Sequence, residues 1–220
     1  MTDFALARRN MVDGQLRPNR VTNTQLLAVI ADLPRERFLP VGLRSVAYAD
    51  EDVPLGNGRY LMEPMILARL IQNLQPQPED KALVVASGAG YGAALLARLV
   101  KSVIAIEADI QLSGSAGQTL KDIGVTNLRL VTGKMEEGYA GEAPYDVILI
   151  DGAVQHVPAA IVDQLADGGR LGLVMAAPSA GVLGVAQLMV KEGGIVSGRP
   201  IFDAGTPPLP GFVSPPRFTF

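Results

Sequence analysis

Hydrophobic positions in the first 80 residues recur at helical spacing, and prolines separate the helical segments. The predicted helices cover residues 3–16, 22–33 and 63–74. Pro18 and Pro34 end the first two helices, whereas Pro64 suits the first turn of the third. Residues 35–63 are predicted to be irregular because prolines and glycines interrupt them.

From residue 81 onward, short and almost continuously apolar segments alternate with helical patterns. The predicted strands cover 82–86, 102–107, 128–131, 145–151 and 170–175, and the helices between them 91–100, 109–123 and 157–166. Such alternation predicts an α/β fold with a Rossmann-like, doubly wound, mostly parallel sheet that carries helices on both faces. Residues 183–194 and 195–204 read as a closing antiparallel pair joined at Gly193-Gly194.

The two patterns suggest how the chain is organised. Residues 1–80 are expected to form a helical cap and residues 81–220 the Rossmann-like domain, together one compact unit. A domain boundary at 75–78 is the alternative. The last 15 residues hold five prolines, so an extended tail is expected that ends in an edge strand and packs on the sheet or on another subunit.

Composition narrows the functional classes. Hydrophobic residues make up 48% and no apolar run approaches 18 residues, so neither disorder nor a membrane span is expected. A net charge of −3, aromatic residues at 5% and no Trp argue against a nucleic-acid partner. The chain has no Cys and one His, His156, which excludes thiolate chemistry and multi-histidine metal sites and favours the cytoplasm.

A glycine turn and a later acid carry the candidate chemistry. The first predicted strand runs into Ser87-Gly88-Ala89-Gly90, and Glu107 follows Gly88 by 19 residues at the end of the next strand. An acid at this spacing suits the two hydroxyls of a ribose, which indicates a nucleoside cofactor. Two glycines favour a mononucleoside over a dinucleotide. The alternative is that the glycines only make a tight turn and that Glu107 caps the next helix.

Several longer motifs occur along the chain in addition to the glycine turn and Glu107. They are 11–17 (MVDGQLR), 34–40 (PRERFLP), 47–48, 53–55, 58–64 (GRYLMEP), 88–91, 106–107, 144–146 and 164–171 (QLADGGRL). In their order and spacing, the chain resembles the protein-L-isoaspartate O-methyltransferase family of the seven-stranded S-adenosylmethionine-dependent methyltransferases. The resemblance implies an antiparallel C-terminal strand, methylation of isoaspartyl carboxylates in damaged proteins, and cofactor contacts from residues 87–90, Glu107, Lys134 and Met135.

The chain departs from the family pattern at four places. Met62 stands where the family has a serine, Val84 where it has an acid, and Ala86 where it has a glycine. Lys134 replaces the acid of a Gly-Asp-Gly turn, whereas Glu107 is retained. Three lost hydrogen bonds of about 1 kcal/mol each would weaken cofactor binding roughly a hundredfold.

On the acceptor side, Arg59, Met62 and Asp151 are the candidates. Arg59 suits a carboxylate acceptor, with a solvated loop charge as the alternative. Asp151 ends a strand where ligands gather in parallel sheets, or else it serves as a turn acid. Met62 is expected to pack, and His156 to be an exposed loop residue. A carboxylate acceptor is already ionised at pH 7, so no general base is required.

Three functions remain open. The first is S-adenosylmethionine-dependent methylation of protein carboxylates, with damaged protein as the partner. The second is a binding or regulatory protein of this fold without catalysis, favoured by the departures at Met62, Val84, Ala86 and Lys134. The third is methylation of a small metabolite. No motif specifies an oligomeric state.

Overall fold

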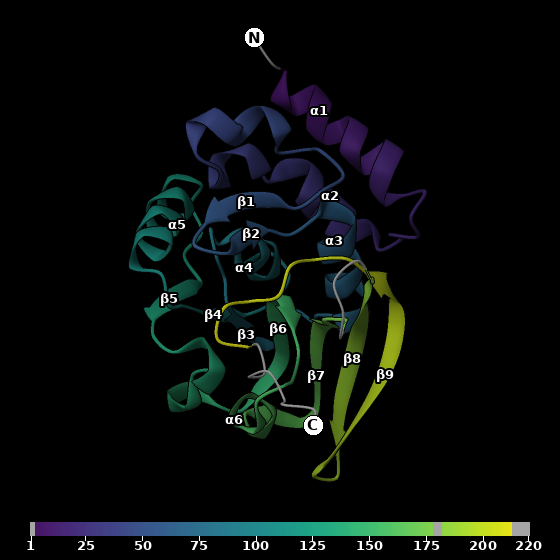
Figure 1. Ribbon diagram of the computed structural model, residues 1–220, viewed down its shortest axis with the longest axis vertical. Coiled ribbons are helices and arrows are strands. Elements are labelled where there is room, and N and C mark those ends of the chain that lie inside the picture. Colours follow the sequence, from purple (N-terminus) through teal and green to yellow (C-terminus); the bar gives the residue numbers. More distant parts are fainter. Residues whose placement is uncertain (1–2, 178–181, 213–220) are drawn as a thin grey trace, which may run out of the picture.

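The computed structural model describes residues 3–177 and 182–212. Seven strands form one sheet in the order β5-β4-β3-β6-β7-β8-β9 (Figure 1). The strands are β3 (Lys81–Val85), β4 (Ser102–Glu107), β5 (Leu128–Thr132), β6 (Tyr145–Val154), β7 (Leu165–Met175), β8 (Gly184–Glu192) and β9 (Ile195–Ala204). The first five run parallel, and β8 and β9 pair antiparallel. The Rossmann-like mixed sheet is therefore confirmed, including its closing antiparallel pair.

The register of the central strands sets the place of the site. Val85 at the end of β3 pairs with Ile106 of β4 on one side and with Ile150 of β6 on the other. The next residues, Glu107 and Asp151, therefore lie at the level of the turn that follows β3. Parallel strands bring their carboxyl ends to one edge, which is where ligands bind in such sheets.

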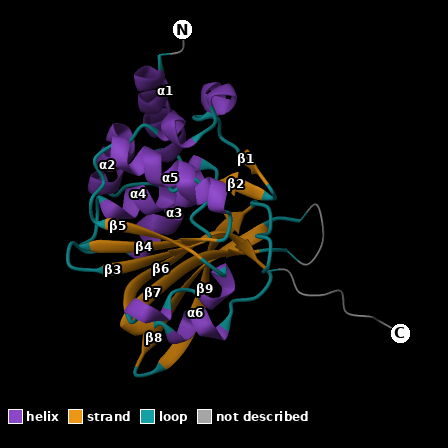
Figure 2. Ribbon diagram, turned by 90° about the vertical axis from the view of Figure 1, so that its left-hand side faces the viewer, coloured by secondary structure: helices purple, strands orange, loops and turns teal. Residues whose placement is uncertain are grey.

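The helices cover the two faces of the sheet unequally (Figure 2). Those on the first side are α1 (Phe4–Met11), α2 (Thr24–Asp32), α3 (Pro64–Leu74), α4 (Tyr91–Ala97) and α5 (Ile110–Asp122). Within the described ranges, the opposite face carries a single α-helix, α6 (Ala159–Asp163). This helix is shorter than the predicted 157–166 because β6 extends to Val154 and β7 already begins at Leu165.

The starts of the helices follow the signals in the sequence. The Asn23 side chain accepts a hydrogen bond from Leu26 N at 2.9 Å and caps α2, and the Asp109 side chain caps α5 in the same way. Pro64 occupies the first turn of α3. Helix α1 continues through a π-helical turn, Val12–Leu16, so the predicted helix over 3–16 is confirmed apart from this change of geometry.

The segment predicted to be irregular contains a small hairpin. Strands β1 (Val53–Gly56) and β2 (Arg59–Leu61) pair antiparallel after two 3-10 turns, Arg35–Phe38 and Val41–Val46. Asn57 and Gly58 connect them with φ angles of 50° and 69°. Asn-Gly is the strongest short signal for such a hairpin, so the prediction of an irregular 35–63 is wrong at this point. The hairpin delivers Arg59 to the site.

After β9 the chain returns across the sheet and packs against the face that carries α6, called here the second face (Figure 1). Leu209 N donates to Ala153 O at 2.8 Å, and Gln155 N donates to Phe212 O at 3.1 Å. Leu209 and Phe212 are buried with the apolar residues of that face. A Cβ at Gly152 would lie 2.5 Å from Leu209 Cδ2, so only glycine allows this approach. The tail packs on the sheet; the predicted edge strand after residue 212 lies outside the described residues.

Replacing Phe212 by alanine is expected to lower the free energy of unfolding by about 3 kcal/mol, because it leaves a cavity on the second face. Phe212 is fully buried, whereas Ile195 is 74% exposed, so Ile195→Ala serves as the matched control and should stay within about 0.5 kcal/mol of wild type. Urea unfolding measures both. Equal stability of the two variants would show that the tail contributes no packing energy.

No helix within the described residues is long and apolar enough to span a bilayer.

Candidate active site

The turn after β3 is built around main-chain conformations that favour glycine. Gly88 and Gly90 have φ angles of 54° and 89°, and Gly90 N donates to Ser87 O at 2.8 Å. Ala86 also has a positive φ, 59°, at the position where the related family has glycine. An alanine costs on the order of 1 kcal/mol in this region. The turn thus keeps the backbone shape of a glycine-rich loop at some expense in strain.

Glu107 faces this turn and is fully engaged there. Its Oε2 accepts from Gly88 N at 2.7 Å, and its Oε1 accepts from Ala108 N at 3.0 Å and Asp109 N at 3.1 Å. The side chain is 1% exposed. The N-cap of α5 is Asp109, so Glu107 does not serve as the cap of that helix.

Arg59 makes the second contact to Glu107 Oε2. Its Nη2 donates to that oxygen at 2.9 Å and to Ala86 O at 2.6 Å. The residue is 3% exposed, so it is a buried ion-pair partner and not a solvated loop charge. No sequence pattern indicates this pairing, because the two residues lie 48 positions apart, in a hairpin and in a sheet strand.

Asp151 lies next to this pair, inside β6 and not at its end. Its side chain is buried, and Oδ1 has no hydrogen-bond partner. Burial raises the pKa of Asp151 to about 7, although Arg59 and Arg35 lower it; Glu107 adds to the rise. A Cβ at Gly92 would lie 2.6 Å from Oδ2, so the bare glycine of α4 makes room for this carboxyl group.

Arg59, Met62 and Asp151 line one small hollow of about 10 Å³, closed by the C-terminal segment at Thr206 and Leu209. All three acceptor-side candidates are thereby brought together. Met62 belongs to the main apolar core, and its carbonyl oxygen accepts from Arg35 Nη2 at 2.7 Å. The side chain of Met62 offers packing at this place and no hydrogen bond.

Lys134 and Met135, the two candidate residues that follow β5, lie in different surroundings. Gly133 N donates to Glu107 O at 3.1 Å, which holds this turn against β4. Lys134 is exposed and its Nζ pairs with Glu137 at 2.9 Å. Met135 is buried in the apolar cluster of the second face, together with Phe212. The turn therefore adjoins the end of β4, but its lysine points away from Glu107 toward Glu137.

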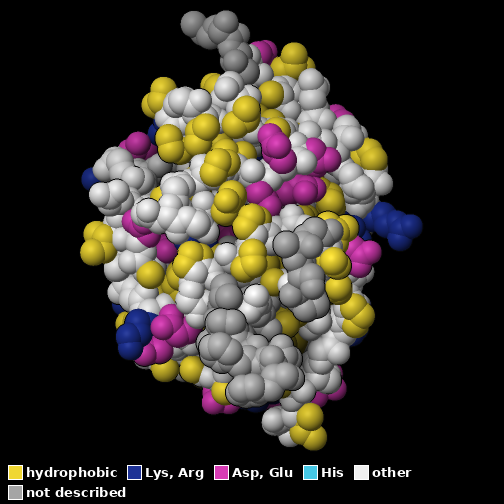
Figure 3. Space-filling model, in the orientation of Figure 1, with side chains coloured by type: hydrophobic (Ala, Val, Ile, Leu, Met, Phe, Trp, Pro, Cys, Tyr) yellow, Lys and Arg dark blue, Asp and Glu magenta, His cyan; other side chains and the backbone are white. Residues whose placement is uncertain are grey.

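Acidic side chains gather on the face that carries the hairpin and the tail (Figure 3). Glu63 N donates to Asp52 Oδ1 at 2.7 Å. Burial, followed by the neighbouring charges of Asp50 and Asp52, raises the pKa of Glu63 to about 7. Thr206, which lines the hollow, lies beside Asp52. Carboxyl groups therefore lie beside the hollow on the side of Thr206.

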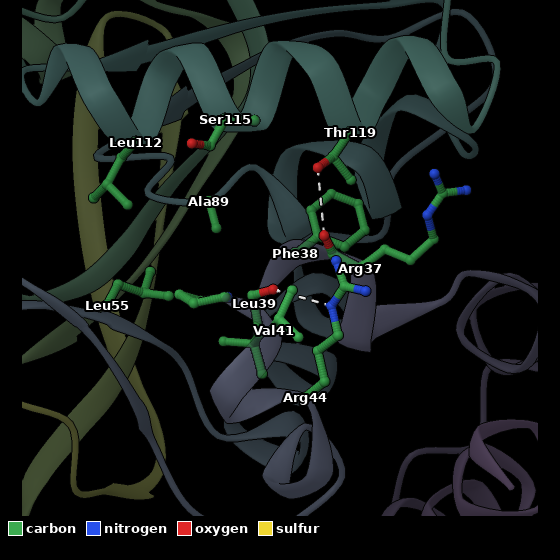
Figure 4. Close-up of a pocket in the computed structure, with 12 residues that line it drawn as sticks. Arg37, Phe38, Leu39, Val41, Arg44, Leu55, Ala89, Leu112, Ser115 and Thr119 are labelled. Atoms are coloured by element: carbon green, nitrogen blue, oxygen red, sulfur yellow. Dashed lines mark hydrogen bonds between the residues drawn. The ribbon is translucent and has the colours of Figure 1, made fainter. Parts of the chain in front are cut away.

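A larger groove of about 310 Å³ opens between α5 and the 3-10 turns (Figure 4). Leu55 and Ala89 form its wall on the side of the glycine turn. Two of its polar side chains bind backbone carbonyls of the groove: Arg44 Nε donates to Leu39 O at 3.4 Å, and Thr119 Oγ1 donates to Arg37 O at 3.3 Å (Figure 4). Of the candidate residues, only Ala89 reaches this groove.

Two further features bear on the chemistry. His156 is exposed, in the bend that follows β6. Across the described ranges, no group of three His, Asp or Glu side chains is arranged to hold a metal ion.

The protein-L-isoaspartate(D-aspartate) O-methyltransferase family model matches residues 7–197. The chain belongs to that family. A protein-L-isoaspartate O-methyltransferase from Koribacter versatilis is 37% identical over 211 residues, covering 96% of this chain and 94% of the relative. One from Methanoculleus marisnigri is 37% identical over 164 residues, covering 74% of each chain. The family reaction is O-methylation of damaged aspartyl residues in proteins.

Solved structures of the family share the fold. A protein-L-isoaspartate O-methyltransferase superposes with a TM-score of 0.79 at 22% identity; the match covers 93% of this chain and 66% of that longer one. A Plasmodium falciparum member, solved in complex with S-adenosyl-L-homocysteine, gives 0.77 at 18% identity and covers 92% of this chain and 97% of the other. At these identities the comparison establishes architecture.

Proposed function

We propose that this family member is an S-adenosylmethionine-dependent O-methyltransferase for isoaspartyl carboxylates in damaged proteins. One observation carries the proposal: Gly88 N binds Glu107 from the glycine turn, and Ala108 N and Asp109 N bind it from its own segment, so the carboxylate is fixed beside that turn. A carboxylate fixed at this edge of a parallel sheet is placed to accept a ribose hydroxyl at Oε2 once the guanidinium of Arg59 leaves that oxygen.

The polar groups of the site fit such a cofactor. Ser87 Oγ and Asp151 Oδ1 are buried without a hydrogen-bond partner, and unpaired polar groups of this kind are stabilised by a polar ligand. Glu107 would hold the sugar, and Ser87 with the backbone through Gly90 would hold the rest of the nucleoside. We place the backbone of the turn at Lys134 and Met135 on the side of the base, because Gly133 N holds this turn against Glu107 O.

The bound cofactor supplies an electrophilic methyl group, and the chain supplies position. The guanidinium of Arg59 lines the hollow and suits the acceptor carboxylate. Asp151, whose pKa burial raises to about 7, is partly neutral at that pH, so it repels an approaching carboxylate less than an ordinary aspartate would. Alignment of the carboxylate with the methyl group is then a proximity effect.

The acceptor partner in this proposal is a protein or peptide that carries an isoaspartyl residue. The cysteine-free sequence is consistent with the reducing cytoplasm, where we place the enzyme. The acidic side chains on the face of the hairpin and the net charge of −3 give no attraction for nucleic acid or for an anionic membrane.

The proposal is tested by calorimetry and by methyl transfer. Purified protein is titrated with S-adenosyl-L-homocysteine, and transfer is measured from labelled S-adenosylmethionine to a peptide containing L-isoaspartate. The same peptide with ordinary aspartate is the control. Binding and transfer to the isoaspartyl peptide alone are expected. Binding without transfer to either peptide would point to a small-metabolite acceptor instead.

A second candidate function is supported by one observation. Arg59 occupies the approach to Glu107, as a buried ion pair does in a protein that holds no nucleoside. On this alternative, the chain is a binding or regulatory protein that has lost catalysis. Failure of S-adenosyl-L-homocysteine to bind at millimolar concentration would favour it.

A further inference from the structure

Arg59 fills the space that the glycine turn leaves open. A Cβ at Gly88 would lie 3.6 Å from Arg59 Nη2 and 3.5 Å from Leu55 Cδ1. The guanidinium therefore lies against the bare face of the turn, and it also contacts Glu107. A sugar that approaches Glu107 along this turn meets Arg59 first.

The two partners of this ion pair are held unequally. Without Arg59, Glu107 keeps its three backbone donors, at Gly88, Ala108 and Asp109. Arg59 uses only Nη2, whereas its Nε and Nη1 are buried without a partner. Buried, unpaired donors raise the free energy of a conformation. Arg59 is thus the displaceable partner, and Glu107 is the fixed one.

The displaced guanidinium would remain beside the small hollow where the acceptor is proposed to bind. The Asn57-Gly58 turn of the hairpin precedes Arg59 directly, and the hollow is lined by Arg59, Met62 and Asp151. The hollow as it stands has room for about one water, so an acceptor carboxylate would bind at its edge as Arg59 moves, where it would satisfy Nε and Nη1, the two donors that the closed arrangement leaves unpaired.

We propose that Arg59 competes with the cofactor ribose for Glu107, and that an acceptor carboxylate relieves this competition by binding the displaced guanidinium. Cofactor and acceptor then bind with positive coupling, and Arg59 is the residue that connects them. The inference rests on the proposed function for the identity of the two ligands. It adds a specificity rule: a neutral acceptor cannot open the site, whereas an anionic one does.

The expected linkage is reciprocal, because each ligand favours the same open arrangement. In wild type, a peptide containing L-isoaspartate should raise the affinity for S-adenosyl-L-homocysteine about tenfold, within the usual range of such couplings. The amidated, uncharged analogue of the peptide should not raise it.

Calorimetry on four full-length proteins tests the inference: wild type, Arg59→Gln, Arg59→Lys and the matched control Arg44→Gln. Arg59→Gln should bind S-adenosyl-L-homocysteine about tenfold more tightly than wild type without peptide, since the competitor is gone, and the peptide should no longer change that affinity. Arg59→Lys retains the charge but lacks the Nε and Nη1 donors, so it should still compete for Glu107, and the peptide should raise its affinity for S-adenosyl-L-homocysteine less than in wild type. Arg44 lines the separate groove, so its variant should match wild type within about twofold.

Equal or weaker binding by Arg59→Gln, or a wild type whose affinity the peptide leaves unchanged, would overturn the inference. If Arg59→Gln does not fold, the wild-type peptide titration and Arg59→Lys decide it. A failure of the proposed function can be told apart from a failure of this inference. Tighter binding by Arg59→Gln with no methyl transfer from any variant sustains the competition and rejects the reaction, whereas methyl transfer with unaltered binding does the opposite.

Discussion

Glu107→Gln is expected to lower the free energy of unfolding by about 4 kcal/mol and to abolish binding of S-adenosyl-L-homocysteine. Removal of one partner leaves the guanidinium of Arg59 buried without its counter-charge, which costs about 3–5 kcal/mol. The NH₂ group of the glutamine side chain would also face backbone N–H groups, which donate hydrogen bonds to the carboxylate in wild type. Urea unfolding measures the first effect and calorimetry the second.

The ion pair itself is isolated by a double-mutant cycle. Arg59→Met alone should cost less than Glu107→Gln, because Glu107 retains three backbone N–H donors. The double variant Arg59→Met/Glu107→Gln should recover part of the stability lost by Glu107→Gln, since it removes the unpaired charge. If Glu107→Gln stays within 1 kcal/mol of wild type, the carboxylate does not hold Arg59 as described.

In wild type, ionisation of Asp151 is expected to lower the free energy of unfolding by about 4 kcal/mol as the pH rises from 4 to 7. Asp151→Asn is expected to remove this contribution. Burial raises the pKa of Asp151 from 3.8 to about 7. In this window the folded protein retains a proton that the unfolded chain has released, so the free energy of unfolding decreases with pH at about 1.4 kcal/mol per unit. Asparagine has no such proton, and the variant should be the more stable protein at pH 8.

The groups around Asp151 define the controls for this experiment. Arg59 and Arg35 oppose the rise in its pKa, and Glu107 and Asp52 add to it. Glu63, with a pKa of about 7, changes stability in the same direction over the same window. Urea unfolding at each pH unit is therefore run on wild type, Asp151→Asn and Glu63→Gln. An unchanged pH dependence in Asp151→Asn would show that this carboxyl group is ionised throughout.

Much of the architecture follows from local pattern. The apolar runs at 82–86, 102–107 and 145–151 are almost uninterrupted, so each indicates a strand buried on both faces, and each forms one. The helices capped by Asn23 and Asp109, and the helix that begins at Pro64, start where a capping side chain or a proline indicates it. The hairpin at Asn57-Gly58 carried an equally local signal and could have been predicted.

Other features depended on residues that are distant in sequence. The extension of β6 to Val154 is paired with Met175 of β7, and neither residue shows this alone. Phe212 lies in a proline-rich tail with no periodicity, and only the shape of the second face reveals that it is buried.

By itself, the sequence determined the order of strands and helices, the glycine turn and the acid at position 107. These depend on contacts between near neighbours and on the alternation of apolar runs with helical patterns, both of which the hydrophobic pattern shows. Only the tertiary structure decided that Arg59 is buried against Glu107. A charge carries no mark of its partner, because the energy of an ion pair depends on distance and burial, and these arise when a hairpin and a strand 48 residues apart fold against each other.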